Sequence, residues 1–280
     1  LNALCGRATY ATVTGDIRYC GRALTSSDLV FVPKMNEMNG NLTVREQIYL
    51  IGSLKCRDLE AMNDRLTNLT GILKLTSKLN ISCSSIFNGD KKLVGICMGM
   101  VSNPNILFLD EPTSDMDTAV AQSMMSLLNN LANDTKVAVI MTIKKPSAVL
   151  FGMIQNLYLI ERGRLAYFGP VVDAKRFFST LGYQCPDSVS AADYYLDLVY
   201  SPPTEDPSIT WKNLYLTFNI GALMTAKDGV EVLHGEGLDS CPPSQYHQFI
   251  RLLLYFMKYY SREKGLFGCM LFFSVVRSEE

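Results

Sequence analysis

Short apolar runs alternate with stretches of helical periodicity along the first 200 residues. The runs at 106–109 and 137–141 contain no charged position, which predicts strands buried inside a parallel sheet. Apolar residues at helical spacing predict a helix over 118–133. The predicted strands cover residues 12–19, 29–32, 106–109, 137–141, 156–160 and 165–168. This order of strands and helices predicts an α/β domain.

Two further helices are predicted between the strands at 29–32 and 106–109. Thr43 and Glu46 have the spacing of a capping box, in which each side chain accepts a hydrogen bond from a backbone N–H group. We therefore expect a helix to begin directly after Thr43. A mixed polar and apolar stretch predicts another helix over 61–79.

The composition of the chain changes at residue 201. Three prolines between 202 and 207 predict a linker over 201–247. Residues 248–262 form an amphipathic helical pattern with the cations Arg251, Lys258 and Arg262, which suits either a soluble surface helix or a helix on a membrane surface. We favour the membrane because an apolar run over 265–276 follows directly, although that run is too short to span a bilayer.

Composition excludes several classes of function. Charged residues make up 19% of the chain and the net charge is −1, so there is no electrostatic footprint for nucleic acid. The eight cysteines contain no C-x-x-C pair, which favours reduced thiols over disulfides or a metal site. Two histidines are too few for a His-rich metal site.

Asp110 and Glu111 are the first candidates for chemistry. They follow the predicted strand at 106–109, and ligands of parallel sheets bind at the carboxyl ends of strands. One carboxylate can hold Mg²⁺, and the next can orient and deprotonate an attacking water. Two acids after a strand are by themselves more often a helix cap or a solvated edge.

The residues around Asp110 and Glu111 favour a chemical role over a helix cap or a solvated edge. The run ILFLDEPTSDMD at 106–117 resembles the Walker B and D-loop motifs of ATP-binding-cassette (ABC) proteins, and of their G subfamily in particular, where Asp115 and Met116 would be Gly and Leu. Further blocks resemble the same subfamily: residues 1–7, 42–46, 143–147, 168–170 and 182–198. Residues 1–7 resemble the helix that follows the phosphate loop, and we expect that loop to lie upstream of a truncated start.

The resemblance implies an ABC-type P-loop NTPase fold with a mostly parallel sheet core, a small antiparallel β-subdomain and a helical subdomain. It implies a nucleotide-binding domain over 1–200, the linker over 201–247, and over 248–280 a connecting helix and the start of a possible membrane span. It also implies ATP and Mg²⁺ as cofactors and a second cassette as partner.

The resemblance further assigns a role to each site residue. The implied residues are Asp110 for Mg²⁺, Glu111 as catalytic base, Lys34 at the Q-loop position, Phe87, Asn88, Gly89 and Asp90 as the signature that meets the partner's ATP, Ser114 and Asp117 in the D-loop, and Lys144 at the switch-histidine position.

Four of these positions depart from the family pattern. Lys34 replaces a glutamine and Lys144 a histidine, and an ammonium group has no acceptor and repels Mg²⁺. Phe87 removes the signature hydroxyl, and Asn88 adds a side chain where backbone must come close. We therefore expect this chain alone to be a weak or inactive ATPase.

Three functions remain open. The first is the cassette of a half-transporter, on the cytoplasmic side, coupling ATP binding and hydrolysis in a dimer to transport of a lipid-like or xenobiotic substrate by a membrane domain after residue 280. The second is a catalytically silent pseudo-cassette that regulates or dimerises. The third, a soluble ABC ATPase, is disfavoured by the 182–198 block and the basic helix.

Overall fold

The computed structural model describes residues 1–8, 10, 12–15, 17–19, 21–23, 25, 27–34, 37–161, 163–186, 189–200 and 243–262. The chain divides into two compact units. The first contains Leu1–Pro112, Leu127–Thr142 and the segment from His234, and the second contains Thr113–Ser126 and Ile143–Leu233.

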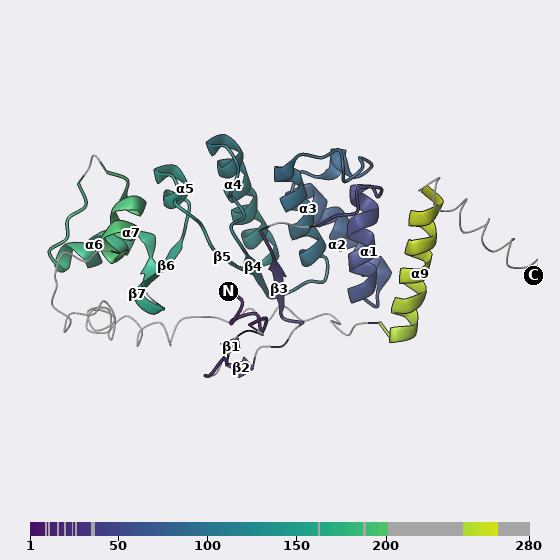
Figure 1. The fold of residues 1–280 in the computed structure, drawn as a ribbon, viewed down its shortest axis with the longest axis horizontal. Helices are drawn as coiled ribbons and strands as arrows, with labels where there is room; N and C mark the ends of the chain where they lie inside the picture. Colours follow the sequence, from purple (N-terminus) through teal and green to yellow (C-terminus); the bar gives the residue numbers. More distant parts are fainter. Residues whose placement is uncertain are drawn as a thin grey trace, which may run out of the picture. The chain divides into compact units, whose positions relative to one another are not determined.

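A three-stranded parallel sheet forms the centre of the first unit (Figure 1). Its strands are β3 (Leu29–Val32), β4 (Ile106–Leu109) and β5 (Ala138–Met141), in that order. β4 lies between the other two, and all four of its residues are buried. The predicted α/β class and the predicted position of β4 at the centre of the sheet are therefore confirmed.

Helices connect these strands along the chain. The connection from β3 to β4 contains α1 (Val44–Lys55), α2 (Leu59–Ile72), the short 3-10 helix η1 (Thr76–Lys78) and α3 (Asn88–Met100), and α4 (Thr118–Thr135) connects β4 to β5. α3 approaches β3 so closely that a Cβ atom on Gly99 would lie 2.4 Å from a methyl carbon of Val30. The predicted capping box is present, since Thr43 accepts from the N–H of Glu46, and Glu46 from the N–H of Thr43.

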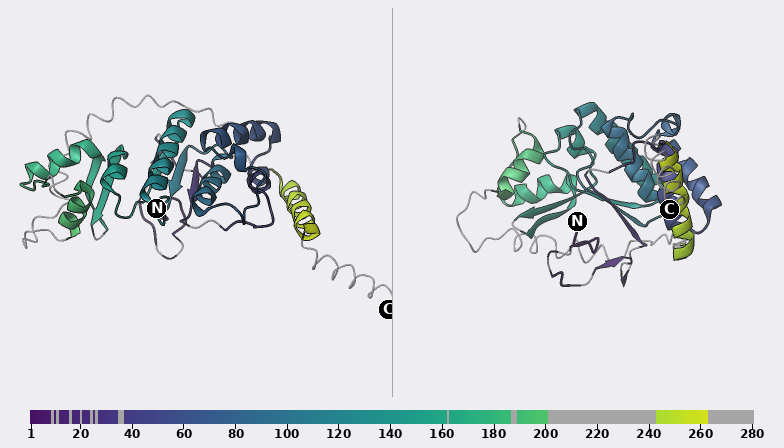
Figure 2. Two further views of the ribbon diagram at one scale, coloured as in Figure 1. Left: turned by 90° about the horizontal axis from the view of Figure 1, so that it is seen from above. Right: turned by 45° about the vertical axis from the view of Figure 1, so that its right-hand side comes forward.

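The helix α9 (Gln245–Arg262) also belongs to the first unit. It lies beside α1 (Figure 1), and Figure 2 shows the same pair from two further directions. The Gln248 amide donates to the carbonyl of Leu54 at 3.2 Å, and Arg251 donates to the carbonyl of Ser53 near the end of α1. An unpaired carbonyl at a helix end needs such a donor, so α9 caps the C-terminus of α1.

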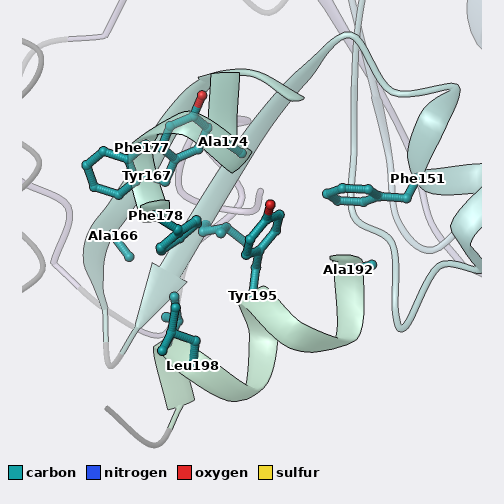
Figure 3. Packing of buried hydrophobic residues seen from close by; sticks show 11 residues of the cluster. Phe151, Ala166, Tyr167, Ala174, Phe177, Phe178, Ala192, Tyr195 and Leu198 are labelled. Carbon is teal, nitrogen blue, oxygen red and sulfur yellow. The ribbon is translucent and has the colours of Figure 1, made fainter. Parts of the chain in front are cut away.

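An aromatic cluster holds the second unit together. β6 (Asn156–Glu161) and β7 (Arg164–Pro170) form an antiparallel pair, and α5 (Ala148–Gly152), α6 (Val171–Thr180) and α7 (Ala191–Tyr200) complete the unit. The Phe178 and Tyr195 rings stack at 4.6 Å between centroids, and Tyr167 and Phe177 pack beside them (Figure 3). Such contacts stabilise beyond the burial of area alone, so the 182–198 block, which contains Tyr195, helps to form this core.

Four expectations about local structure were wrong. The strand expected at 12–19 is only β1 (Arg18–Tyr19), paired with β2 (Arg22–Ala23), because Gly15 turns the chain at a φ of 110°. The helix expected over 61–79 ends at Ile72, and Lys74 takes a φ of 54°, which no α-helix continues.

The other two corrections concern the chain start and β5. Residues 1–7 form hydrogen-bonded turns that stop at Gly6, whose φ is 66°. β5 was expected to be buried, but its residues alternate between exposed and half-buried, and Ile140 is 40% exposed. β5 is an outer strand of the described sheet and pairs with β4 alone. The helix predicted over 248–262 begins three residues earlier, at Gln245.

Candidate functional site

At the carboxyl end of the three-stranded sheet, the first residues of the loops after β3, β4 and β5 lie close together. The register pairs Leu109 of β4 with Val32 on one side and Met141 on the other. The residues that follow each strand therefore meet at one edge, which we call the β4 edge: Pro33, Lys34, Asp110, Glu111 and Thr142. Sequence reasoning predicted this place for Asp110 and Glu111 and marked Lys34 as a site residue by resemblance, and the structure adds Thr142.

Asp110 is held rigidly by its neighbours. Its N–H group donates to the carbonyl of Val32 at 3.0 Å, which extends the pairing of β3 and β4 by one residue. Its Oδ1 atom accepts from the hydroxyl of Thr142 at 2.8 Å. The same hydroxyl accepts from the N–H of Glu111 at 2.9 Å. One hydroxyl thus fixes both acidic residues.

Thr142 was missed as a functional residue, although the sequence contained a signal for it. It directly follows the predicted strand at 137–141, as Asp110 follows the strand at 106–109. Adjacent parallel strands place such residues side by side at one edge. A hydroxyl next to a carboxylate at that point is a predictable hydrogen bond.

Glu111 forms an ion pair with Lys34. The Lys34 Nζ atom donates to Glu111 Oε2 at 2.8 Å, and the two side chains are 42% and 27% exposed. The Glu111 backbone has a φ of 45°, a left-handed conformation that costs free energy in a residue other than glycine. Lys92 donates to the backbone carbonyl of Glu111 at 3.3 Å. The residue expected to act as a base is therefore bonded to one ammonium group and contacted by a second.

The β4 edge does not fit a divalent cation. Mg²⁺ is usually held by one or two carboxylates together with water and phosphate oxygens, and a nearby ammonium group repels it. Among the described residues there is no group of three or more Asp, Glu, His and Cys side chains that could hold a metal. A shallow, mostly apolar hollow at this edge is lined by Lys34 and Lys92 as well as Asp110. The β4 edge thus carries two carboxylates, of Asp110 and Glu111, and two ammonium groups, of Lys34 and Lys92.

The predicted signature residues form the start of α3 in the first unit. Phe87 is the N-cap of this helix and makes no capping hydrogen bond, because its side chain has no acceptor. The ring is 83% exposed. Asn88 and Gly89 open the first turn, and the carboxylate of Asp90 pairs with Lys78 at 2.5 Å. These four residues are consecutive at the N-terminus of α3, and its N-cap is an exposed aromatic residue.

The remaining predicted site residues lie in the second unit: Ser114, Asp117 and Lys144. Asp117 Oδ1 accepts from the N–H of Val120 at 2.9 Å and so caps α4. Asp115, where the resemblance expects glycine, has a φ of 61°, the left-handed region that favours glycine. The structure thus shows a local reason for a glycine at that position.

Comparisons with known proteins agree with the motifs. The sequence profile described as ABC transporter matches residues 1–114, and the profile described as ABC-2 type transporter matches residues 144–220. ABC transporter G family member 28 of Arabidopsis thaliana is 32% identical over 231 residues, which is 76% of this chain and 21% of that protein. ABC transporter G family member 3 of Dictyostelium discoideum is 27% identical over 274 residues, 90% of this chain and 20% of that protein.

One further relative and one solved structure complete the comparison. The broad substrate specificity ATP-binding cassette transporter ABCG2 of Sus scrofa is 28% identical over 177 residues, 60% of this chain and 27% of that protein. The structure of cbiO1 from Clostridium perfringens, part of the ABC transporter complex cbiONQ, has 17% sequence identity and a TM-score of 0.56 over 62% of this chain and 73% of that one. This likeness confirms the fold.

The chain spans about a fifth to a third of the length of the curated relatives it matches. Within the part of the chain that the structure describes, every helix is too short or too polar to cross a membrane. The motifs, the fold and the relatives lead to one assignment. The chain belongs to the ABC transporter family, and it carries the nucleotide-binding cassette of a G-subfamily member.

Proposed function

We propose that this chain is the cassette of a half-transporter that pairs with a second cassette and whose own β4 edge does not hydrolyse ATP. Nucleotide turnover in the dimer then depends on the partner's catalytic residues, and the transported substrate is lipid-like or xenobiotic. The names of the relatives support transport, and the name of the Sus scrofa protein supports broad substrate specificity. Residues 1–200 form the cassette in this proposal and residues 201–247 the linker.

The ion pair between Lys34 and Glu111 carries the proposal of a silent edge. A catalytic base must offer a free oxygen to the attacking water and must accept its proton. The ammonium group of Lys34 donates to Oε2 of Glu111 at 2.8 Å and so competes with water for one of the two carboxylate oxygens. An opposite charge at this distance also stabilises the ionised carboxylate, which makes it a weaker base. Both effects act against hydrolysis.

The start of α3 supports the same conclusion for the partner's site. In the family, the signature closes over the ATP that the other cassette binds, through a hydroxyl and backbone N–H groups. Phe87 offers no hydroxyl, and its exposed ring stands at the helix N-terminus, where the phosphate would have to approach. We therefore propose that this chain weakens both composite sites of the dimer.

ATP is the cofactor that the family implies, and Mg²⁺ accompanies it there. Asp110 is the residue that would hold the metal by resemblance, but the ammonium groups of Lys34 and Lys92 both contact the adjacent Glu111. The proposal therefore includes nucleotide binding in the complete protein and no metal-dependent step at this edge.

The exposed face of α9 supports attachment to a membrane. Tyr246, Phe249, Leu253 and Phe256 recur at intervals of three and four residues and are all exposed, Phe249 by 61%. The helix contains no acidic residue. An apolar face on a basic helix binds the boundary between lipid headgroups and acyl chains. We propose that residues 248–280 bring the cassette to the cytoplasmic surface of a membrane and lead into a membrane domain.

Phosphate release by the complete gene product tests the silent edge. We expect release at the background rate for the protein alone, and the same rate for Glu111→Gln, because Glu111 is already engaged. Co-expression with a competent G-subfamily cassette should give turnover that Glu111→Gln leaves within about twofold. A loss of tenfold or more in Glu111→Gln, alone or with the partner, would show that Glu111 acts as a base and would refute the proposal.

A further inference from the structure

We propose that the Lys34 ammonium group takes the place of the divalent cation at the β4 edge, so that this cassette carries its own cation and excludes Mg²⁺. The inference rests on the proposed function only in treating the β4 edge as the place that the phosphates of a nucleotide would approach. It concerns the binding of a metal, which a cassette with or without ATPase activity could show.

The position of the ammonium group carries the argument. Lys34 Nζ lies 2.8 Å from Glu111 Oε2, at the carboxyl end of β4, beside the residue that would hold the metal by resemblance. Asp110 offers one oxygen to the hydroxyl of Thr142 at 2.8 Å. Lys92 Nζ donates to the backbone carbonyl of Glu111 at 3.3 Å. A cation that approached Asp110 and Glu111 would therefore meet two ammonium groups beside Glu111.

The charges of the side chains at the β4 edge also act against a bound divalent cation. The side chains of Asp110 and Glu111 contribute two negative charges, and those of Lys34 and Lys92 contribute two positive charges. The four groups therefore sum to zero, whereas a divalent cation is bound by sites of net negative charge. Replacing Lys34 with glutamine would leave one net negative charge and would add a carbonyl oxygen as a possible ligand.

The size of the effect follows from Coulomb's law. Two unit charges 4 Å apart in water repel by about 1 kcal/mol, and a divalent ion doubles this value. Removing one ammonium group should therefore tighten metal binding by about 30-fold, which corresponds to about 2 kcal/mol at 1.4 kcal/mol per tenfold change. A lower effective dielectric at the edge would make the change larger.

Mn²⁺ titration of the full chain tests the inference without any nucleotide. The electron paramagnetic resonance signal of free Mn²⁺ decreases as the ion binds, so it reports occupancy directly. We expect no saturable site in the natural chain. We expect one site in Lys34→Gln and in Lys34→Met, which Mg²⁺ displaces and which Asp110→Asn removes. Circular dichroism spectra that match the natural chain establish that each variant is folded.

A matched control distinguishes the loss of a positive charge at the β4 edge from the loss of one elsewhere on the chain. Lys136 is an exposed lysine just before β5, at the opposite end of the sheet, and Lys136→Gln removes the same charge. We expect this variant to bind no more Mn²⁺ than the natural chain.

Each remaining outcome contradicts the inference. An Asp110-dependent Mn²⁺ site in the natural chain would show that Lys34 does not exclude metal. No gain in either Lys34 variant would show that something else prevents binding. A gain in Lys34→Gln alone would assign the effect to the new amide oxygen, and an equal gain in Lys136→Gln would assign it to net charge. ATP hydrolysis by the complete protein would instead refute the proposed function and leave this titration to be judged separately.

Discussion

Replacing Thr142 with valine tests whether one hydroxyl group organises the β4 edge. Valine has nearly the same shape as threonine and differs by a methyl group in place of the hydroxyl. The change removes the hydrogen bond to Asp110 Oδ1 at 2.8 Å and leaves the N–H of Glu111, at 2.9 Å from the same oxygen, without this acceptor. Both β4 and the start of the following loop lose an anchor.

The expected loss of stability can be worked from these two bonds. A hydrogen bond to a charged group contributes about 1.5–3 kcal/mol, and a bond between neutral groups contributes about 0.5–1.5 kcal/mol. Thr142 is half-buried, so water replaces part of both interactions. We therefore expect Thr142→Val to lower the free energy of unfolding by about 1–2 kcal/mol.

Urea unfolding followed by far-ultraviolet circular dichroism measures this loss. With a dependence of about 2 kcal/mol per molar urea, the midpoint should fall by about 0.5–1 M. Thr142→Ser keeps the hydroxyl and should unfold within about 0.3 M of the natural chain. If Thr142→Val unfolds with the natural chain, or if serine is as damaging as valine, the hydroxyl does not hold this edge together.

Three further predictions follow from the described residues. A double-mutant cycle of Lys34→Met and Glu111→Gln should give a coupling energy of about 0.5–1 kcal/mol in urea unfolding, because the pair is partly exposed. This coupling should decrease in 1 M salt. A coupling of zero would show that the ion pair does not contribute to stability. Gly99→Ala should destabilise by about 1–3 kcal/mol, because its Cβ atom would clash with a β3 valine, whereas Gly71→Ala, whose Cβ atom meets nothing within 4 Å, should stabilise slightly. Burial raises the pKa of the Cys97 thiol to about 12, so this thiol should resist maleimide at pH 8 until the chain unfolds; rapid labelling of the folded chain would contradict its burial.

The apolar and polar pattern was sufficient for the centre of the fold. The strands at 29–32 and 106–109 have the predicted bounds, because an uninterrupted apolar run followed by a proline or an acid leaves little choice of limits. The helix after Thr43 starts where its capping box predicts. The strand expected at 12–19 was wrong because a single glycine conformation, at Gly15, is invisible in a hydrophobic pattern.

The sequence marked most residues of the candidate site, but it did not predict most of the contacts between them. Register brings Lys34, Asp110 and Glu111 to one edge, and the sequence already marked all three. The sequence left open whether Lys144 pairs with Glu111, and the structure describes an ion pair between Lys34 and Glu111. Which lysine reaches a carboxylate depends on loop conformation after the strand, and side-chain chemistry alone does not determine it.

The cysteines also show which features the sequence predicts and which the structure adds. The sequence predicts reduced thiols, and the five described cysteines form no disulfide with one another: Cys5, Cys56, Cys83, Cys97 and Cys185. Cys20, Cys241 and Cys269 lie outside the described residues. Burial follows from the pattern around each residue: Cys97, within the apolar part of α3, is fully buried.

Anomalous diffraction from crystals of the full chain soaked in Mn²⁺ tests whether the Lys34 ammonium group takes the place of a divalent cation. We expect Lys34 Nζ within hydrogen-bonding distance of Glu111 and no anomalous peak beside Asp110. A manganese peak at a coordinating distance from Asp110, with Lys34 turned away from Glu111, would contradict the claim that this cassette carries its own cation at the β4 edge.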